Sequence, residues 1–334
     1  MAGRTRIPER GRCLLPGRGR AAPVSLRFAG SWIAAVALFA IGGAISPGLF
    51  AATGITAILQ VASFTGLAAI GETVVMLTGG IDLSMAGTIT LANNAVAIAA
   101  NGQDGLLPAG LGVALALAAL AGALNGLLVT RVRISPLIAT LATGAIYEGV
   151  ALLYTGGSPK GAIPAGLASV GQGRAGILPY DALIWIGVTV AAAFLLRRTP
   201  WGRAVHAVGA SPMAAVVSGV RTRAVTFSAY LVSGILGGCT GILLAAYVAS
   251  PSLSIGDQYL LGPIAAAAVG GTLLTGGVGS ALGTAGGALF VTMAVVIATV
   301  LHVSSSVSFV IEGAIIIVSV ALTTRSVAGI LSRE

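Results

Sequence analysis

Long apolar stretches, separated by short polar breaks, occupy most of the chain. A membrane-spanning helix needs about 20 apolar residues, and the stretches have about that length. Turn-forming residues mark the breaks, as in Ser46-Pro47-Gly48 and Ser250-Pro251-Ser252. The pattern predicts an all-α polytopic membrane protein with about ten transmembrane helices. Their approximate bounds are residues 28–46, 55–78, 83–100, 109–130, 135–155, 181–197, 224–249, 260–277, 280–301 and 306–323.

Two of these regions leave open whether the helix is continuous or broken. Residues 55–78 form either one long span or a short span with a re-entrant piece, and the glycine-rich region 262–290 has the same alternatives. Broken helices at membrane depth are stable only where protein buries them or where they line a water-filled path. The segments Leu77–Gly80 and Leu274–Gly277 both read Leu-Thr-Gly-Gly. Internal repeats are common in transporters, although coincidence in a glycine-rich chain accounts for most of this signal.

The basic residues are distributed asymmetrically between the two sides of the predicted bundle. An even number of spans places both termini on one side of the membrane. If that side is the cytoplasm, 16 of the 18 Lys and Arg residues are cytoplasmic, and only Lys160 and Arg174 lie outside. This distribution satisfies the positive-inside rule. We therefore expect cytoplasmic N- and C-termini.

Composition narrows the class of protein. Hydrophobic residues make up 56% of the chain and charged residues only 8%, against about a quarter in soluble domains. A water-soluble globule is therefore excluded. The net charge of +9 is concentrated in a tail, residues 1–27, that contains seven arginines. Such a cluster before a first span is typical of a cytoplasmic segment near anionic lipid, and it does not require a nucleic-acid partner.

Three regions follow from this organisation. Residues 1–27 are expected to be a basic, disordered cytoplasmic tail, which we favour over a cleaved signal peptide because further spans follow. Residues 28–325 form the transmembrane domain, and residues 326–334 form a short cytoplasmic tail.

Motifs for enzymatic chemistry are missing from the sequence. There are two histidines, no His-Glu-x-x-His motif and no Cys/His cluster, so neither a metal nor another cofactor is expected. The sequence has no Gly-x-x-x-x-Gly-Lys-Ser/Thr phosphate loop and no Gly-x-Ser-x-Gly nucleophile motif. The chain is therefore not expected to be an enzyme, and any ATP must be bound by a partner protein.

The connection formed by residues 199–223 is too long for a tight turn. Ser211 followed by Pro212 is typical of a helix start, with serine as N-cap, and Gly219 is typical of a stop. We predict a short helix over residues 212–218 on the cytoplasmic surface. Two interpretations stay open, because the helix suits a groove on a partner and equally suits packing against this protein's own helix ends.

Polar side chains within the spans are candidates for a solute pathway. Thr90 and Asn94 share one helical face of the third predicted span, with Asn93 beside it, and Gln60 lies in the second. These side chains either contact a polar solute or join helices to one another, a role that Asn and Thr also fill. Asn93 and Asn94 are the stronger pathway candidates.

Intramembrane carboxylates are costly and require an explanation. Asp82 is a pathway candidate, but we favour a structural role as the cap of the helix that follows it. Glu72 is either a pathway residue or the partner of a cytoplasmic arginine such as Arg131 or Arg133. Glu148 and Glu312 are further intramembrane acids whose role the sequence does not decide.

Three motifs, in order along the chain, resemble those of ATP-binding-cassette (ABC) importer permeases of the ribose and simple-sugar type. The first is Thr78-Gly79-Gly80-Ile81-Asp82-Leu83-Ser84, which resembles that family's TGGIDLS signature. The second lies in the 199–223 connection, which resembles the family's coupling loop. The third is the Ala- and Gly-rich stretch at residues 264–277. The matching positions of the coupling loop are Gly202, Arg203, Gly209, Ser211, Pro212, Ala214, Ala215, Ser218 and Gly219.

The resemblance implies a plasma-membrane translocation subunit that imports a pentose, a hexose or a similar solute. It also implies three protein partners: an ABC ATPase, an extracytoplasmic solute-binding protein, and a second permease subunit that is either identical or a paralogue. A nucleoside or a branched-chain amino acid is the alternative solute. An ion-coupled secondary transporter working through Glu72 or Glu148 is the alternative of a different class.

Overall fold

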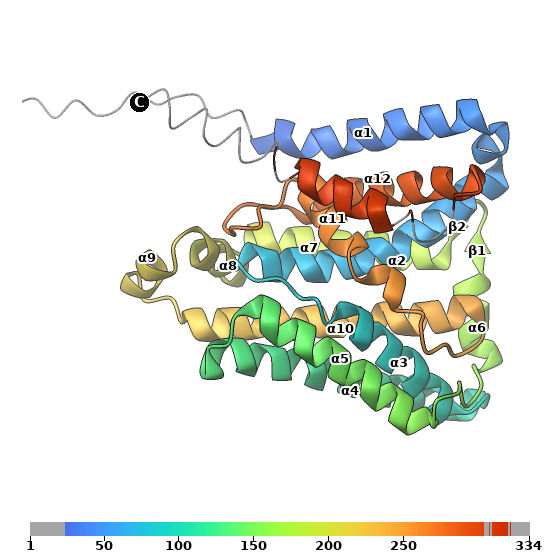
Figure 1. The fold of residues 1–334 in the computed structure, drawn as a ribbon, viewed down its shortest axis with the longest axis horizontal. Helices are drawn as coiled ribbons and strands as arrows, with labels where there is room; N and C mark the ends of the chain where they lie inside the picture. Colours follow the sequence, from blue (N-terminus) through green and yellow to red (C-terminus); the bar gives the residue numbers. More distant parts are fainter. Residues whose placement is uncertain (1–23, 304–306, 308, 320, 322–334) are drawn as a thin grey trace, which may run out of the picture.

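A computed structural model describes residues 24–303, 307, 309–319 and 321. Long helices run side by side along one axis of the molecule (Figure 1). The α-helices are α1 (Val24–Ile45), α2 (Ala52–Leu77), α3 (Met85–Ala100), α4 (Leu107–Leu127), α5 (Pro136–Thr155), α6 (Ala165–Gln172), α7 (Tyr180–Arg198), α8 (Pro200–Ala210), α9 (Pro212–Val217), α10 (Thr222–Val248), α11 (Gly262–Val269) and α12 (Ala281–Val300).

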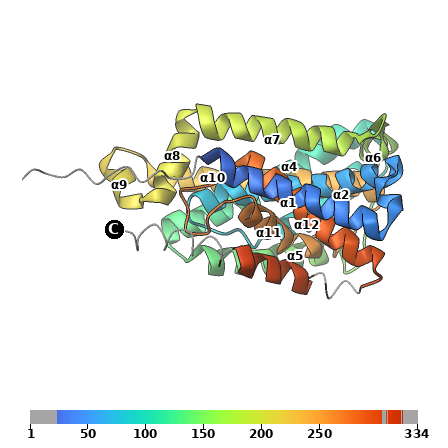
Figure 2. The same ribbon diagram turned by 90° about the horizontal axis from the view of Figure 1, so that it is seen from above.

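Short elements join the long helices. They are the 3₁₀ turns η1 (Pro47–Phe50), η2 (Asp104–Leu106) and η4 (Asp257–Tyr259), the π-helical turn η3 (Leu128–Val132), and an antiparallel pair of strands, β1 (Arg174–Ala175) and β2 (Leu178–Pro179). The strands and α6 lie at one end of the bundle, and α8 and α9 project from the other end (Figures 1 and 2).

Helices α2 and α10 form the centre of the bundle. Helix α2 packs against α7, α10, α11 and α12, and α10 also packs against α3 and α4. Small residues allow these close approaches in place of bulky side chains. At Gly122 of α4 and Gly234 of α10, for example, the two backbones meet directly. The interior of the bundle is therefore held by tight helix crossings.

The prediction of an all-helical polytopic membrane protein is confirmed. Six helices in the described part of the chain are long and apolar enough to cross a membrane. They cover Ala52–Leu77, Asp104–Val132, Pro136–Thr155, Tyr180–Arg198, Thr222–Val248 and Ala281–Val300. Three shorter apolar helices, Ala29–Ile45, Met85–Ala100 and Phe309–Ser319, also coincide with predicted spans.

Of the two alternatives for the glycine-rich region, the structure shows the broken one, and residues 260–277 are not one continuous span. Only α11, eight residues long, is helical there, and residues 270–280 form an irregular loop. The backbone has positive φ at Gly271, Gly276 and Gly277, which a right-handed helix does not contain. High apolar content did not distinguish helix from loop in this stretch. The other uncertain region is resolved in the opposite sense, since α2 is one unbroken helix.

The predicted tails lie outside the described residues, with one exception. Residues 24–27, assigned to the basic N-terminal tail, form the first turn of α1. The first helix therefore begins four residues before its predicted start at residue 28. The prediction of disorder for residues 1–23 and of a cytoplasmic tail for residues 326–334 falls outside the structure.

Candidate functional site

The segment between α2 and α3 contains a buried polar cluster centred on Asp82. One carboxylate oxygen of Asp82 accepts the Ser84 hydroxyl at 2.6 Å and the Ser84 backbone N–H at 3.1 Å. The other accepts the hydroxyl of Ser233, on α10, at 2.7 Å. Asn125 of α4 donates to the Ser84 hydroxyl at 2.6 Å. Asp82 therefore joins the non-helical chain before α3 to two neighbouring helices.

The same segment is attached to α5 through its backbone. The Thr140 hydroxyl accepts the Leu83 N–H at 3.1 Å and lies 3.1 Å from the Ile81 carbonyl oxygen. Buried backbone groups outside regular structure need such partners. The cluster explains how an irregular segment is stable inside the bundle.

Two predictions for the carboxylates are corrected. Asp82 is not the N-cap of α3, because Ser84 occupies that position and Asp82 lies two residues earlier. Glu72 does not pair with Arg131 or Arg133. Its carboxylate is fully buried and instead accepts the backbone N–H of Asp82. The two carboxylate oxygens lie 3.1 Å and 3.3 Å from the Asp82 nitrogen. Both acids support the break between α2 and α3.

The polar face of α3 binds the segment of chain that follows α10. Asn93 accepts the Ser252 N–H at 3.0 Å, and Asn94 donates to the Ser252 carbonyl at 2.9 Å. Thr90 accepts the Gly256 N–H at 3.2 Å. These three predicted pathway residues therefore lie together, and each binds the protein's own backbone. The Asn94 side-chain oxygen is buried without a partner among the described residues.

Gln60 lies apart from this group. Its side-chain nitrogen donates to the Gly171 carbonyl at 2.6 Å and to the Asp181 carboxylate at 3.0 Å. Gly171 belongs to α6, at the end of the bundle opposite α9. Gln60 therefore joins α2 to α6 and α7. Sequence reasoning did not single out Asp181, although an acid at the start of an apolar stretch is a usable signal.

We expect Asn93→Leu to lower the free energy of unfolding by about 2 kcal/mol, since it removes two neutral hydrogen bonds worth about 1 kcal/mol each. The lost partners are the Ser252 N–H and the Gly241 carbonyl. Chemical denaturation in detergent measures the change, with Thr299→Val as a control at an exposed hydroxyl that bonds within its own helix. Unchanged stability with a raised KM for solute would instead indicate a pathway residue.

The 199–223 connection forms two helices, α8 and α9, of which the sequence predicted the second. Ser211 accepts the Ala214 N–H at 3.3 Å, and α9 begins at Pro212, as predicted. Helix α9 ends at Val217, one residue before the predicted end, and Gly219 follows with φ +80°. The preceding helix, α8, has its own cap at Thr199, which accepts the Gly202 N–H at 3.2 Å.

Helix α9 has one face toward the protein and one toward solvent. Ala215 is only 3% exposed. Met213 and Val217, in contrast, are 75% and 83% exposed. The two interpretations left open for this helix therefore apply to different faces. Ala215 packs against the protein itself, and the exposed apolar face is the part available to a partner.

The remaining residues of the predicted coupling loop differ in environment. Gly202 is buried, with its α-carbon turned toward the backbone carbonyls that end α7, whereas Arg203 is exposed. Ala214 is exposed on α9, and Ser218 is its C-cap. Gly209, near the end of α8, contacts the chain at both Leu-Thr-Gly-Gly segments.

These segments meet each other at Gly209. The Gly277 N–H donates to the Leu77 carbonyl at 3.0 Å, which joins the end of α2 to the loop after α11. A Cβ atom on Gly209 would overlap with both of these backbone groups. We call this three-way contact of Leu77, Gly209 and Gly277 the glycine junction. It connects the projecting helices to two non-helical segments, residues 78–84 and 270–280.

The other two intramembrane acids lie away from the Asp82 cluster in the chain. Glu148 is half-buried on α5. Glu312 is buried near the start of α11, where its carboxylate faces Gly262. One carboxylate oxygen of Glu312 has no hydrogen-bond partner among the described residues.

Comparison with known proteins identifies the family. A family model described as the permease component of branched-chain amino acid transport systems matches residues 54–320. The ribose import permease protein RbsC of Bacillus subtilis is 33% identical over 302 residues, which cover 90% of this chain and 93% of the relative. RbsC of Escherichia coli K12 is 33% identical over 299 residues, covering 88% and 93%.

A relative with a different named solute matches at a similar level. The autoinducer 2 import system permease protein LsrC of Klebsiella pneumoniae is 36% identical over 263 residues, which cover 78% of this chain and 76% of the relative. No solved structure matches the chain. The family match and the coverage of these relatives confirm the resemblance carried by the three motifs, and the chain belongs to this family of import permease components.

Proposed function

We propose that the chain is the transmembrane subunit of an ABC importer in the plasma membrane for a simple sugar, such as a pentose or a hexose. Two relatives named for ribose and one named for autoinducer 2 support this solute class. A separate ATPase supplies the energy, an extracytoplasmic binding protein delivers the solute, and a second permease subunit completes the channel. The chain itself carries out no hydrolysis and holds no cofactor.

The distribution of arginines supports cytoplasmic termini for a chain of ten membrane crossings, one of which is the interrupted stretch at residues 260–277. Arg131, Arg197 and Arg223 lie where long helices end or begin near α8 and α9. Arg174 belongs to β1, at the opposite end of the bundle (Figure 1). Under the positive-inside rule, the end with α8 and α9 faces the cytoplasm. This orientation presents α9 to a cytoplasmic ATPase.

The observation that carries the proposal is the exposed apolar face of α9. A six-residue capped helix that projects from the bundle and exposes Met213 and Val217 is suited to a groove on another protein. An ion-coupled carrier has no need for such a surface. We therefore assign this face to the ATPase.

The glycine junction gives a route from ATP hydrolysis to the solute path. Movement of α9 shifts α8, and α8 contacts the Leu77 and Gly277 backbones through Gly209. The contacts involve two non-helical segments, residues 78–84 and 270–280, of which the first contains the buried Asp82. We propose that their rearrangement alternates access to a solute pathway beside the polar face of α3.

We expect Val217→Glu to reduce ATPase binding and ATP-driven uptake without lowering the stability of the permease, because a charge would enter an apolar contact and no buried group is disturbed. Co-purification of the ATPase and a thermal unfolding assay measure the two effects. The control is Ile177→Glu, which changes an exposed apolar residue at the opposite end of the bundle.

A bulky charge at Ala215 provides a contrast. Because Ala215 is buried, we expect that substitution to destabilise α8 and α9 themselves. Full ATPase binding by Val217→Glu would contradict the assignment of the α9 face. Uptake that needs no ATPase, and that is lost in Glu72→Gln or Glu148→Gln, would favour an ion-coupled carrier.

The solute needs its own test, because the family model is described by branched-chain amino acids and the relatives by ribose and autoinducer 2. Uptake in proteoliposomes with the complete system should be highest for a pentose or hexose. A preference for a nucleoside or a branched-chain amino acid would retain the importer assignment and replace the solute.

A further inference from the structure

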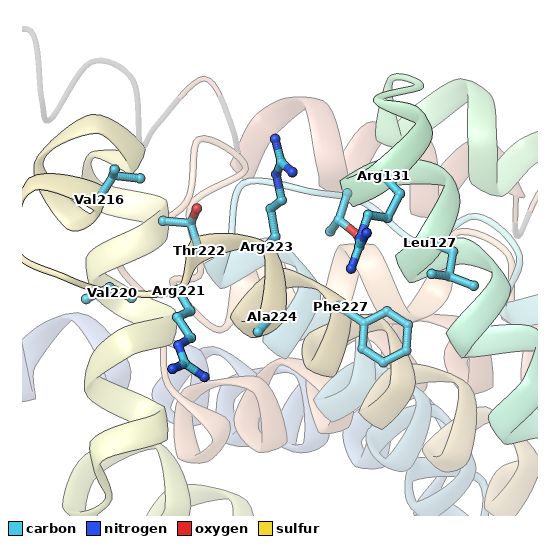
Figure 3. Close-up of a pocket in the computed structure, with 10 residues that line it drawn as sticks. Leu127, Arg131, Val216, Val220, Arg221, Thr222, Arg223, Ala224 and Phe227 are labelled. Atoms are coloured by element: carbon cyan, nitrogen blue, oxygen red, sulfur yellow. The ribbon is translucent and has the colours of Figure 1, made fainter.

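A basic cavity of about 760 Å³ lies where α4 and α10 meet the projecting helix α9. Ten residues line it: Leu127, Thr130, Arg131, Val216, Val220, Arg221, Thr222, Arg223, Ala224 and Phe227. Three of them are arginines and none is acidic. Figure 3 shows Arg131 on the helix at one side of the cavity and Arg223 on the helix at the other. The cavity is therefore suited to an anion.

The arginines of the cavity are available for a ligand. Arg131, Arg221 and Arg223 are all exposed, and no acidic side chain in the described part of the chain forms an ion pair with them. Guanidinium groups bind phosphate oxygens through paired hydrogen bonds. Arg131 and Arg223 lie on helices at the two sides of the cavity, whereas the Arg221 side chain points the opposite way from Arg223 (Figure 3). A pair of guanidinium groups favours a phosphate group over a neutral polar ligand.

The depth of the cavity distinguishes a lipid from a soluble anion. Arg131 lies near the end of the span Asp104–Val132, and Arg223 near the start of the span Thr222–Val248. Both side chains are therefore at the level of the lipid headgroups. Leu127 and Phe227 are each four residues further into the same spans, about 6 Å deeper at 1.5 Å per residue. Leu127 is exposed to the surroundings, and Phe227 is half-buried.

We infer that this cavity binds an anionic phospholipid, with its phosphate between Arg131 and Arg223 and an acyl chain along Leu127 and Phe227. The order of groups along the membrane normal, basic at the surface and apolar below it, matches the order of groups in such a lipid. The inference depends on the proposed membrane orientation and not on the identity of the solute. Because Val216 of α9 also lines the cavity, a bound lipid would support α9 in its position.

Native mass spectrometry of the purified full-length chain tests the inference, with phosphatidylglycerol and phosphatidylethanolamine added as separate probes. We expect tighter retention of phosphatidylglycerol by the wild type. The variant Arg131→Gln/Arg223→Gln should weaken phosphatidylglycerol binding by about 25- to 30-fold, since each arginine near a membrane surface contributes about fivefold. The control Arg133→Gln/Arg198→Gln removes the same charge from helix ends outside the cavity and should bind like the wild type.

Several results would overturn the inference. Equal retention of the two lipids, or equal loss in the cavity variant and the control variant, would show that the cavity does not select an anionic lipid. Displacement by glycerol phosphate at the concentration of the lipid would indicate a site for a soluble anion. Loss of ATPase binding in the cavity variant, with phosphatidylglycerol binding intact, would assign the arginines to the ATPase. Thermal unfolding of each variant confirms that it is folded.

Discussion

Replacement of Gly209 with alanine is expected to destabilise the folded permease and to abolish transport. The added Cβ would overlap with the Leu77 carbonyl oxygen and the Gly277 amide nitrogen. Both are backbone atoms, so neither can move aside by changing a rotamer. Overpacking commonly costs 1–3 kcal/mol, and we expect a loss of about 3 kcal/mol here. Thermal unfolding in detergent and uptake in proteoliposomes measure the two effects.

The control for this substitution is Gly187→Ala on α7. No atom lies within 4 Å of the Cβ position at Gly187. Alanine also favours a helix over glycine by up to about 1 kcal/mol, so the unfolding temperature should stay the same or rise slightly. Wild-type stability and uptake in Gly209→Ala would contradict the glycine junction. Normal stability with lost uptake would show that the junction transmits movement without stabilising the fold.

Asp82→Ala is expected to lower the free energy of unfolding by about 3 kcal/mol. The substitution leaves the hydroxyls of Ser84 and Ser233 without their carboxylate acceptor in a fully enclosed site. Each unsatisfied buried donor costs about 1–3 kcal/mol, and removal of a buried charge offsets part of the total. Chemical denaturation of the variant and the wild type in the same detergent measures the difference.

Two related variants make this prediction specific. Asp82→Asn keeps an oxygen that accepts the Ser84 hydroxyl and places an amide NH₂ beside Ser233, whose hydroxyl oxygen can accept from it. We therefore expect about half of the loss in unfolding free energy. Ser233→Ala removes one hydrogen bond to the carboxylate and should cost about 1.5 kcal/mol. If Asp82→Ala keeps wild-type stability and only solute uptake changes, the carboxylate acts in the pathway and not in the fold.

The sequence was sufficient to predict most of the helical framework. Predicted spans 135–155 and 181–197 agree with α5 and α7 within one residue at each end, because apolar length and turn residues determine where a chain enters and leaves a membrane. Residues 260–277 do not form one continuous span, although they are as apolar as the spans that were predicted correctly. Their alanines and glycines are apolar enough for a helix, but hydropathy carries no information about the positive φ values at Gly271, Gly276 and Gly277.

The candidate site was predicted less completely. The N-cap at Ser211 is local chemistry, and the sequence was sufficient to place it. The partners of Asp82 are not local, since Asn125 and Ser233 lie 43 and 151 residues away. Asn125 was nevertheless detectable as a lone amide in an apolar span. An arginine partner was one of two alternatives for Glu72, and the backbone N–H that the structure shows as its partner carries no signal in the sequence.

The meeting of the two Leu-Thr-Gly-Gly segments shows the limit of sequence reasoning most clearly. The repeat is visible in the sequence, where coincidence in a glycine-rich chain is enough to explain it. In the structure, Leu77 of one copy accepts a hydrogen bond from Gly277 of the other. This contact between residues 200 positions apart depends on the packing of α2, α8 and the loop after α11, which a single sequence does not specify.

One measurement tests the central claim most directly: solute uptake into proteoliposomes that contain the permease, its co-purified ATPase and the binding protein. The account predicts that a simple sugar accumulates only when ATP is supplied on the side of α9, and that Val217→Glu in the permease prevents this accumulation. Uptake by the permease alone, driven by an ion gradient and independent of ATP, would contradict it.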